Sequence, residues 1–160
     1  MLTRNGMIAA ACTSLLAIWG LAFAAEPAAS PDAAFVSKAV PAGREEVMAA
    51  RAALKMSKSA GVRKAARMMH RDHRTANDAL TALAKQKGWV LPPRDVSAAT
   101  PANYSDNDYV ESQIKAHQDA IALFTDEASG GADADLRAFA QKTLPALMHH
   151  LTVLQALQSS

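Results

Sequence analysis

The sequence predicts an all-α protein, a ferritin-like four-helix bundle of two helical hairpins joined by a long connector. Three observations support this fold class. Half of the residues are hydrophobic but only 5% are aromatic, with abundant alanine and leucine, and this composition favours helices. Apolar residues recur at helical spacing in four stretches. Residues 88–105 carry three prolines and no periodicity, which is typical of a connector, here unusually long for a compact domain.

Residues 1–25 are predicted to be a secretory signal peptide, and residues 26–160 the bundle domain. Arg4 is the only charged residue before Glu26, and the apolar run between them ends in Ala22-Phe23-Ala24. A basic start, an apolar centre and small residues at the cleavage position are typical of such a peptide. We therefore expect a periplasmic or exported protein.

An uncleaved membrane anchor is the alternative interpretation, because the apolar run approaches the ~20 residues that a helical span needs. Cys12 is the only cysteine and lies within this run. After cleavage, the mature chain would have no disulfide, no thiolate metal ligand and no cysteine nucleophile.

The first two helices are expected over residues 32–57 and 59–87. Ser30-Pro31 supplies an N-cap followed by proline at the first helical position, where the missing N–H costs nothing. Ser59 can cap the second helix, and Gly88 ends it.

The third and fourth helices are expected over residues 105–128 and 133–158. Ser105 can cap the third helix, and Gly130-Gly131 separates it from the fourth. The connector spans up to ~60 Å when extended, whereas the second helix is only ~40 Å long. Both a crossover topology and a simple up-down-up-down order are therefore open.

Three of the predicted helices place a histidine in the middle of an apolar stripe. These residues are His73, His117 and His150, and Glu46 lies on the inward side of the first helix. Neutral imidazoles with a carboxylate can bind Zn, Mn, Fe, Ni or Cu, and four-helix bundles build such sites from facing helices. The four residues are therefore our candidate metal ligands.

Residue counts from the predicted turns give the relative heights of these side chains. Glu46 and His73 lie 14 and 13 residues from a turn near residue 60, and His117 lies 14 residues from a turn near residue 131. His150 lies 19 residues from that second turn, which displaces it by ~7 Å. The counts predict a site of Glu46, His73 and His117, which His150 joins only if the helices shift or kink at Pro145.

An ordered polar core is the alternative to a metal site. Buried histidines are commonly hydrogen-bonded to carboxylates or hydroxyls, and Glu46 with His73 is a candidate pair. A di-iron centre is not expected, because the Glu-x-x-His pairs that it needs are replaced by His70 before His73 and by Leu147 before His150.

Methionines and arginines suggest two further hypotheses. Thioethers with imidazoles suit copper, but Met69 lies on the core stripe as a space filler. Four arginines follow one face of the second helix: Arg63, Arg67, Arg71 and Arg74. This face can either contact an anionic membrane or be exposed to solvent, with its arginines paired to acidic residues.

No nucleic-acid partner is expected, since the net charge is only +2 and interleaved aromatics are lacking. His149 is expected on the surface.

Several segments together resemble the bacterial domain-of-unknown-function family 4142. They are Met68-Met69-His70-Arg71-Asp72-His73 with Ala76-Asn77, the Lys87-Gly88-Trp89 turn, His117-Gln118, and Thr143-Leu144-Pro145-Ala146-Leu147 with His150-Leu151. The resemblance implies an exported, ferritin-like helical bundle, with peripheral association with the outer membrane as one form of its location, and brings no established activity. The first functional hypothesis is a non-enzymatic envelope protein, stress-related by family analogy. The second is a transition-metal-binding or redox bundle that holds Fe, Zn, Mn or Cu.

Overall fold

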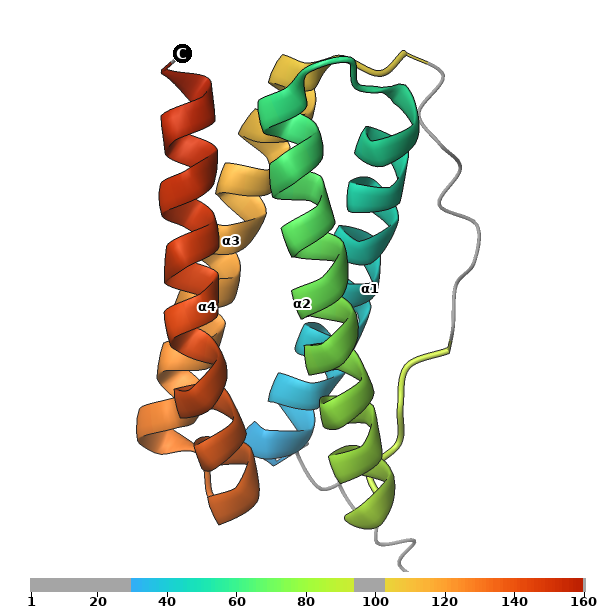
Figure 1. Cartoon of the computed structure of the whole chain (residues 1–160). Coiled ribbons are helices and arrows are strands. Elements are labelled where there is room, and N and C mark those ends of the chain that lie inside the picture. Colours follow the sequence, from blue (N-terminus) through green and yellow to red (C-terminus); the bar gives the residue numbers. More distant parts are fainter. Residues whose placement is uncertain (1–29, 94–102, 160) are drawn as a thin grey trace, which may run out of the picture.

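The computed structural model describes residues 30–93 and 103–159, which contain four long helices (Figure 1). The helices are α1 (Pro31–Met56), α2 (Ala60–Gln86), α3 (Asp106–Gly130) and α4 (Ala134–Gln158). The predicted all-α fold class is confirmed, and every helix lies within two residues of its predicted bounds.

The helix ends follow from local sequence chemistry. At the start of each helix a side-chain oxygen accepts a hydrogen bond from a first-turn N–H, and these N-caps are Ser30, Ser59, Ser105 and Asp133. Behind the end of α2, Gly88 has a φ of 72°, a left-handed conformation that glycine adopts without steric strain. This turn lets the Trp89 N–H donate to the Ala84 carbonyl at 2.9 Å.

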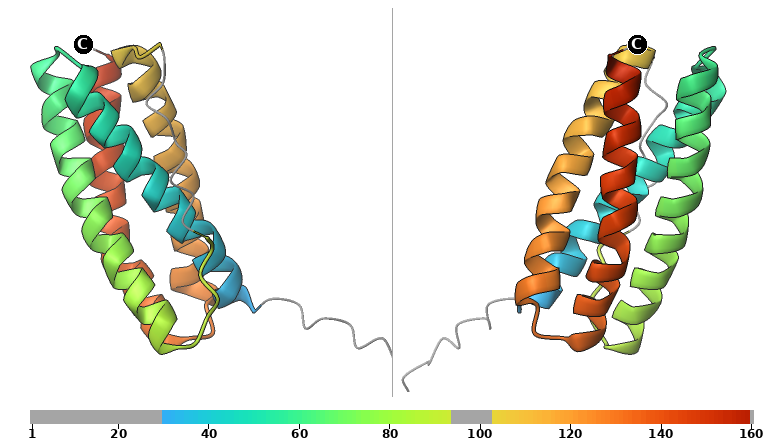
Figure 2. Two further views of the ribbon diagram at one scale, coloured as in Figure 1. Left: turned by 90° about the vertical axis from the view of Figure 1, so that its right-hand side faces the viewer. Right: turned by 60° about the vertical axis from the view of Figure 1, so that its left-hand side comes forward.

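The four helices form two antiparallel hairpins, α1 with α2 and α3 with α4, and α1 also packs on α3 and α2 on α4. The end of α2 and the start of α3 lie at opposite ends of the bundle (Figures 1 and 2). α2 and α3 therefore run in the same direction, and every pair of packed helices is antiparallel. Of the two topologies that the sequence left open, the crossover is the one observed, as in ferritin-like bundles with one long connection.

Polar contacts fix the end of α2 and the first residues of the connector. Lys87 Nζ lies 2.8 Å from an Asp133 oxygen and 2.7 Å from an Asp135 oxygen, which ties α2 to the start of α4. Arg44 Nη1 donates to both carbonyl oxygens of the Pro92-Pro93 pair at 3.2 Å. The chain therefore leaves α2 along α1.

Two apolar clusters fill the bundle on either side of a polar layer. The first cluster includes Phe35, Leu80, Phe124 and Leu136. The second includes Ala50, Val62, Met69 and Leu154. Along every helix, a buried ionisable residue falls between members of the two clusters, and these residues are Glu46, His73, His117 and His150. We call these four residues the polar layer.

Within the described residues, no helix combines the length and the apolar character that crossing a membrane requires. The predicted signal peptide, residues 1–25, lies outside the described residues. Cleavage and export therefore stay predictions.

Candidate metal centre

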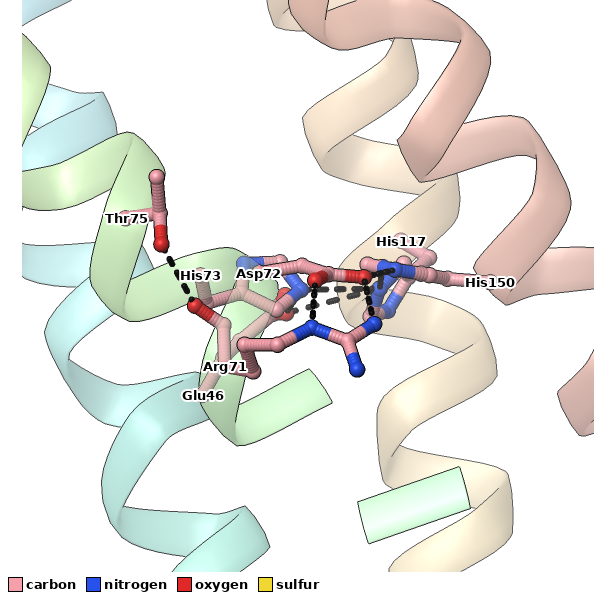
Figure 3. A network of polar contacts seen from close by, with 7 residues as sticks. All are labelled: Glu46, Arg71, Asp72, His73, Thr75, His117 and His150. Carbon is pink, nitrogen blue, oxygen red and sulfur yellow. Dashed lines mark hydrogen bonds and ion pairs between the residues drawn. The ribbon is translucent and has the colours of Figure 1, made fainter. Parts of the chain in front are cut away.

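The polar layer brings one side chain from each helix to a common point (Figure 3). His73 Nε2 lies 2.6 Å from Glu46 Oε2 and 3.2 Å from His117 Nε2. His117 Nε2 in turn lies 3.3 Å from His150 Nδ1 and 3.5 Å from Glu46 Oε2. Each histidine offers one ligand nitrogen, and these three atoms lie within 4.8 Å of one another. All four residues that the sequence singled out therefore meet.

All four side chains are removed from water. His117 is 0% exposed, His150 2%, Glu46 4% and His73 7%. Among the described residues, the ion-pair partners of Glu46 are His73 and His117, with no lysine or arginine beside it. Although Glu46 Oε2 is 2.6 Å from His73 Nε2, it makes no hydrogen bond of acceptable geometry. A buried carboxylate oxygen in this position is costly unless a cation or an aligned donor reaches it.

Two of the histidines have their outer ring nitrogen fixed by a hydrogen-bond acceptor. His117 Nδ1 lies 2.8 Å from the Gln113 carbonyl oxygen, and His150 Nε2 lies 3.1 Å from Asp72 Oδ2. Desolvation opposes ionisation of Asp72, but hydrogen bonds from Arg71 and His150 lower its pKa. A carbonyl and a carboxylate can only accept, so both outer nitrogens donate.

The inner nitrogens of these two rings are consequently unprotonated. Desolvation by burial lowers the pKa of His117, against the raising influence of Glu46. Desolvation also lowers the pKa of His150 to about 4, against the raising influence of Asp72. Both rings are therefore neutral near pH 7, and a neutral imidazole carries a single N–H. His117 Nε2 and His150 Nδ1 thus present lone pairs to each other across 3.3 Å.

The predicted displacement of His150 is wrong, since its ring nitrogen is in direct contact range of His117. His117 lies 13 residues before the end of α3 at Gly130, and His150 lies 16 residues after the start of α4 at Ala134, an offset of only ~4–5 Å. Side chains lean toward the N-terminus of their helix. In an antiparallel pair this moves His117 away from the turn and His150 toward it, which closes the offset. α4 remains one helix through Pro145.

Sequence reasoning missed Asp72 and the Gln113 carbonyl as partners of the site. Asp72 directly precedes His73 and points ~100° away from it around α2, toward α4. A carboxylate directly beside a predicted buried histidine was a usable signal in the sequence. The Gln113 carbonyl lies one turn before His117, where its second lone pair can accept the Nδ1–H. This i to i+4 spacing is common to all helices and carries no specific signal.

The other sequence candidates lie outside the polar layer. Met69 is fully buried in the second apolar cluster, as expected for a space filler. His149 is exposed, as predicted. Arg71 and Arg74 pair with Asp72 at 2.8 Å and Asp78 at 3.9 Å, which supports the solvated-face interpretation of the arginine stripe.

Arg63 of the same stripe faces the α1–α2 turn, where its guanidinium donates to the carbonyls of Leu54 and Ser57. Contact of the arginine stripe with an anionic membrane stays a prediction.

The sequence model of a domain of unknown function, DUF4142, matches residues 20–157. The chain belongs to this family. The resemblance that the sequence motifs indicated is therefore confirmed. No curated protein matches the chain.

Solved structures with the same fold include metal-bound forms. A DUF305 fragment from Deinococcus radiodurans has a TM-score of 0.71 at 15% identity, covering 83% of this chain and 98% of that one. CopM in the Cu(I)-bound form has a TM-score of 0.68 at 15% identity, covering 80% and 95%. CopM in the Ag-bound form obtained by soaking has a TM-score of 0.69 at 16% identity, covering 80% and 94%. At these identities the similarity demonstrates the shared bundle fold.

Proposed function

We propose that this DUF4142 protein binds one divalent transition-metal ion through His73, His117, His150 and Glu46. The observation that carries the proposal is the meeting of three buried histidine ring nitrogens within 4.8 Å of one another, with His117 Nε2 and His150 Nδ1 facing each other 3.3 Å apart. A metal ligand must be deprotonated before it can bind, and both nitrogens already are. A cation at this point also removes the repulsion between their lone pairs and neutralises Glu46.

The spacing of the polar layer supports tetrahedral coordination. Ligand atoms around an ion with bonds of ~2.0–2.1 Å lie ~3.3–3.4 Å apart. The separations of 3.2, 3.3 and 3.5 Å that join His117 to His73, His150 and Glu46 are close to this value. The 2.6 Å separation of Glu46 and His73 is shorter, so Oε2 must move outward by ~0.7 Å when an ion binds.

The outer partners have the arrangement that metal-ligating histidines need. Such histidines donate their second N–H to a carboxylate or a backbone carbonyl, which fixes the ring and its tautomer. Asp72 does this for His150, and the Gln113 carbonyl does it for His117. Arg71 in turn holds Asp72 with a 2.8 Å hydrogen bond.

The donor set favours copper and zinc among the candidate ions. Three imidazoles and one carboxylate form a borderline set without a thiolate, and divalent ions then follow the order in which Cu²⁺ binds most tightly, with Mn²⁺ and Fe²⁺ weaker. The similar bundle CopM is described in Cu(I)- and Ag-bound forms, which supports a metal-binding role for a protein of this fold.

The proposed ligands can be tested by metal analysis of the purified full chain, with isothermal titration by Zn²⁺ and Cu²⁺. We expect one ion per chain, lost in H117Q and H73A but retained in H149A, a control that removes an exposed histidine next to His150. Circular dichroism checks that each variant is folded. Absence of binding, or binding that survives H117Q, would overturn the proposal.

The competing proposal is that the polar layer holds no ion and only stabilises the bundle. The contact of Glu46 with His73 favours it. A proton shared between these two groups balances the buried carboxylate without a metal. In that case the unmodified protein is metal-free, EDTA leaves its melting temperature unchanged, and H117Q only lowers stability.

We also propose that the protein acts in the periplasm as a non-enzymatic metal-binding protein. The support is the signal-peptide pattern of residues 1–25. N-terminal sequencing of protein from a periplasmic extract should give a chain that starts at Ala25 or Glu26. An intact chain that stays in the cytoplasm contradicts this location.

A further inference from the structure

A cavity of ≈710 Å³ lies inside the bundle and reaches the polar layer at Glu46 and His73. Its exposed lining residues belong to α1 and α3, so it opens between these two helices. His117 and His150 do not line it. A solute in the cavity therefore meets Glu46 and His73 before the other two ligands.

The charges around the cavity favour a cation. The lining of the mouth carries Glu45, Asp119 and Asp126 against Lys38, and Lys115 pairs with Asp119 at 2.9 Å, which leaves Glu45 and Asp126 as the carboxylates that outweigh Lys38, although the whole chain has a net charge of +2. A concave surface lined by one sign of charge, with low-dielectric walls behind it, concentrates ions of the opposite sign.

The inner end of the cavity presents oxygen acceptors. Gln113 lines it, is only 4% exposed, and its side-chain Oε1 has no hydrogen-bond partner. Glu46 Oε2 is the second buried oxygen there without an aligned donor. Such groups are costly to bury unsatisfied, and both can accept hydrogen bonds from the water shell of an ion.

We infer that this cavity is the route by which a hydrated metal cation reaches the polar layer, with Gln113 and Glu46 as the first oxygens that it meets. The inference rests on the proposed function. The walls near the route are small, with Ala42, Gly43 and Ala116 on the two helices that flank the mouth, so an ion can enter with part of its water shell. Glu46 and His73 then bind the ion first. His117, whose Nε2 lies 3.2 Å from that of His73 and 3.3 Å from His150 Nδ1, completes its coordination together with His150.

The test is stopped-flow absorption of Co²⁺ binding to the full chain. A42F narrows the mouth and has A79F as its control, which changes another exposed alanine, on α2 outside the cavity. We expect A42F to slow association at least tenfold while the equilibrium affinity stays within twofold, because a blocked route slows binding and release alike. Equal association rates for A42F and A79F would overturn the inference.

The effect of the mouth carboxylates on the association rate is tested with the triple variant E45Q/D119N/D126N. Its control, D78N/D108N/E111Q, removes three exposed carboxylates elsewhere. The triple variant should associate several-fold more slowly than the control at low salt, and the difference should vanish at high salt as screening removes steering. Co²⁺ binding with the same rate in both variants refutes the route but leaves the metal site standing. No Co²⁺ binding to the unmodified protein refutes the metal site and the route together.

Discussion

Removal of the Asp72 carboxylate should weaken metal binding although Asp72 is not a proposed ligand. Asp72 Oδ2 accepts the His150 Nε2–H at 3.1 Å and thereby keeps the proton off Nδ1. In D72A the His150 ring can turn or adopt the other tautomer, which places an N–H where the ion must bind. Loss of such a partner typically costs 10–100-fold in metal affinity, or ~1.4–2.7 kcal/mol.

The structure places the expected loss at the lower end of that range. The Asp72 side chain is 30% exposed, so water can partly replace it as the acceptor for His150. We therefore expect the Zn²⁺ dissociation constant of D72A to rise ~10-fold. D72N retains an acceptor oxygen but loses the charge, and since charge-assisted hydrogen bonds are roughly twice as strong as neutral ones, its loss should be smaller.

The assay is Zn²⁺ competition against a chromophoric chelator at pH 7, with D78A as the matched control. Asp78 lies on the same helix and pairs with Arg74 at 3.9 Å, but its side chain is 77% exposed and it makes no contact with the polar layer. An exposed pair of this kind contributes ~0–1 kcal/mol, so D78A should bind Zn²⁺ like the unmodified protein. If D72A and D78A bind Zn²⁺ equally well, the proton assignment of His150 is wrong.

Three further predictions concern stability, each measured by urea unfolding of the metal-free protein. Burial, with the Asp32 carboxylate nearby, raises the pKa of Glu127 to about 7 from 4.5, so the folded state holds this proton more tightly than the unfolded state and stability falls as pH rises between these values. E127Q should therefore reduce the loss of stability between pH 4 and pH 8 by on the order of 1–3 kcal/mol, and an unchanged pH profile contradicts this. A Cβ on Gly131 would lie 2.8 Å from the Glu127 backbone oxygen and closer still to its carboxylate, so G131A should cost ~1–3 kcal/mol. G130A, which meets nothing within 4 Å, should be neutral or stabilising, and similar effects of the two substitutions refute the clash. Leu136 is 0% exposed, so L136A should cost ~2–5 kcal/mol, and a cost under ~1 kcal/mol means that the first apolar cluster packs differently.

The helix bounds were predictable because short-range chemistry sets them. Ser30, Ser59, Ser105 and Asp133 cap the helices through contacts that span only a few residues. The level pairing of Glu46 with His73 was also predictable, since a short turn fixes the register of α1 against α2. These features depend on sequence spacing alone.

The height of His150 and the role of Asp72 depend on three-dimensional directions that spacing does not contain. Counting residues along two helices ignores the lean of their side chains, and this lean decided whether His150 meets His117. The function of Asp72 depends on which helix lies beside the neighbouring face of α2. That neighbour is α4, and only the crossover topology, which the sequence left open, places it there.

The four proposed ligands of the polar layer differ in how firmly the structure holds them. Here His117 and His150, whose outer ring nitrogens are fixed by Gln113 and Asp72, do not line the cavity. Glu46 and His73 face the cavity, and Glu46 Oε2 lacks an aligned hydrogen bond. His117 and His150 are thus held in place by their outer partners and are shielded from water. Glu46, which must move when an ion binds, borders the cavity that water and ions can enter. This division predicts that Glu46→Gln accelerates metal release much more than it slows metal association, and equal changes in both rates would show that Glu46 is not the exchanging ligand.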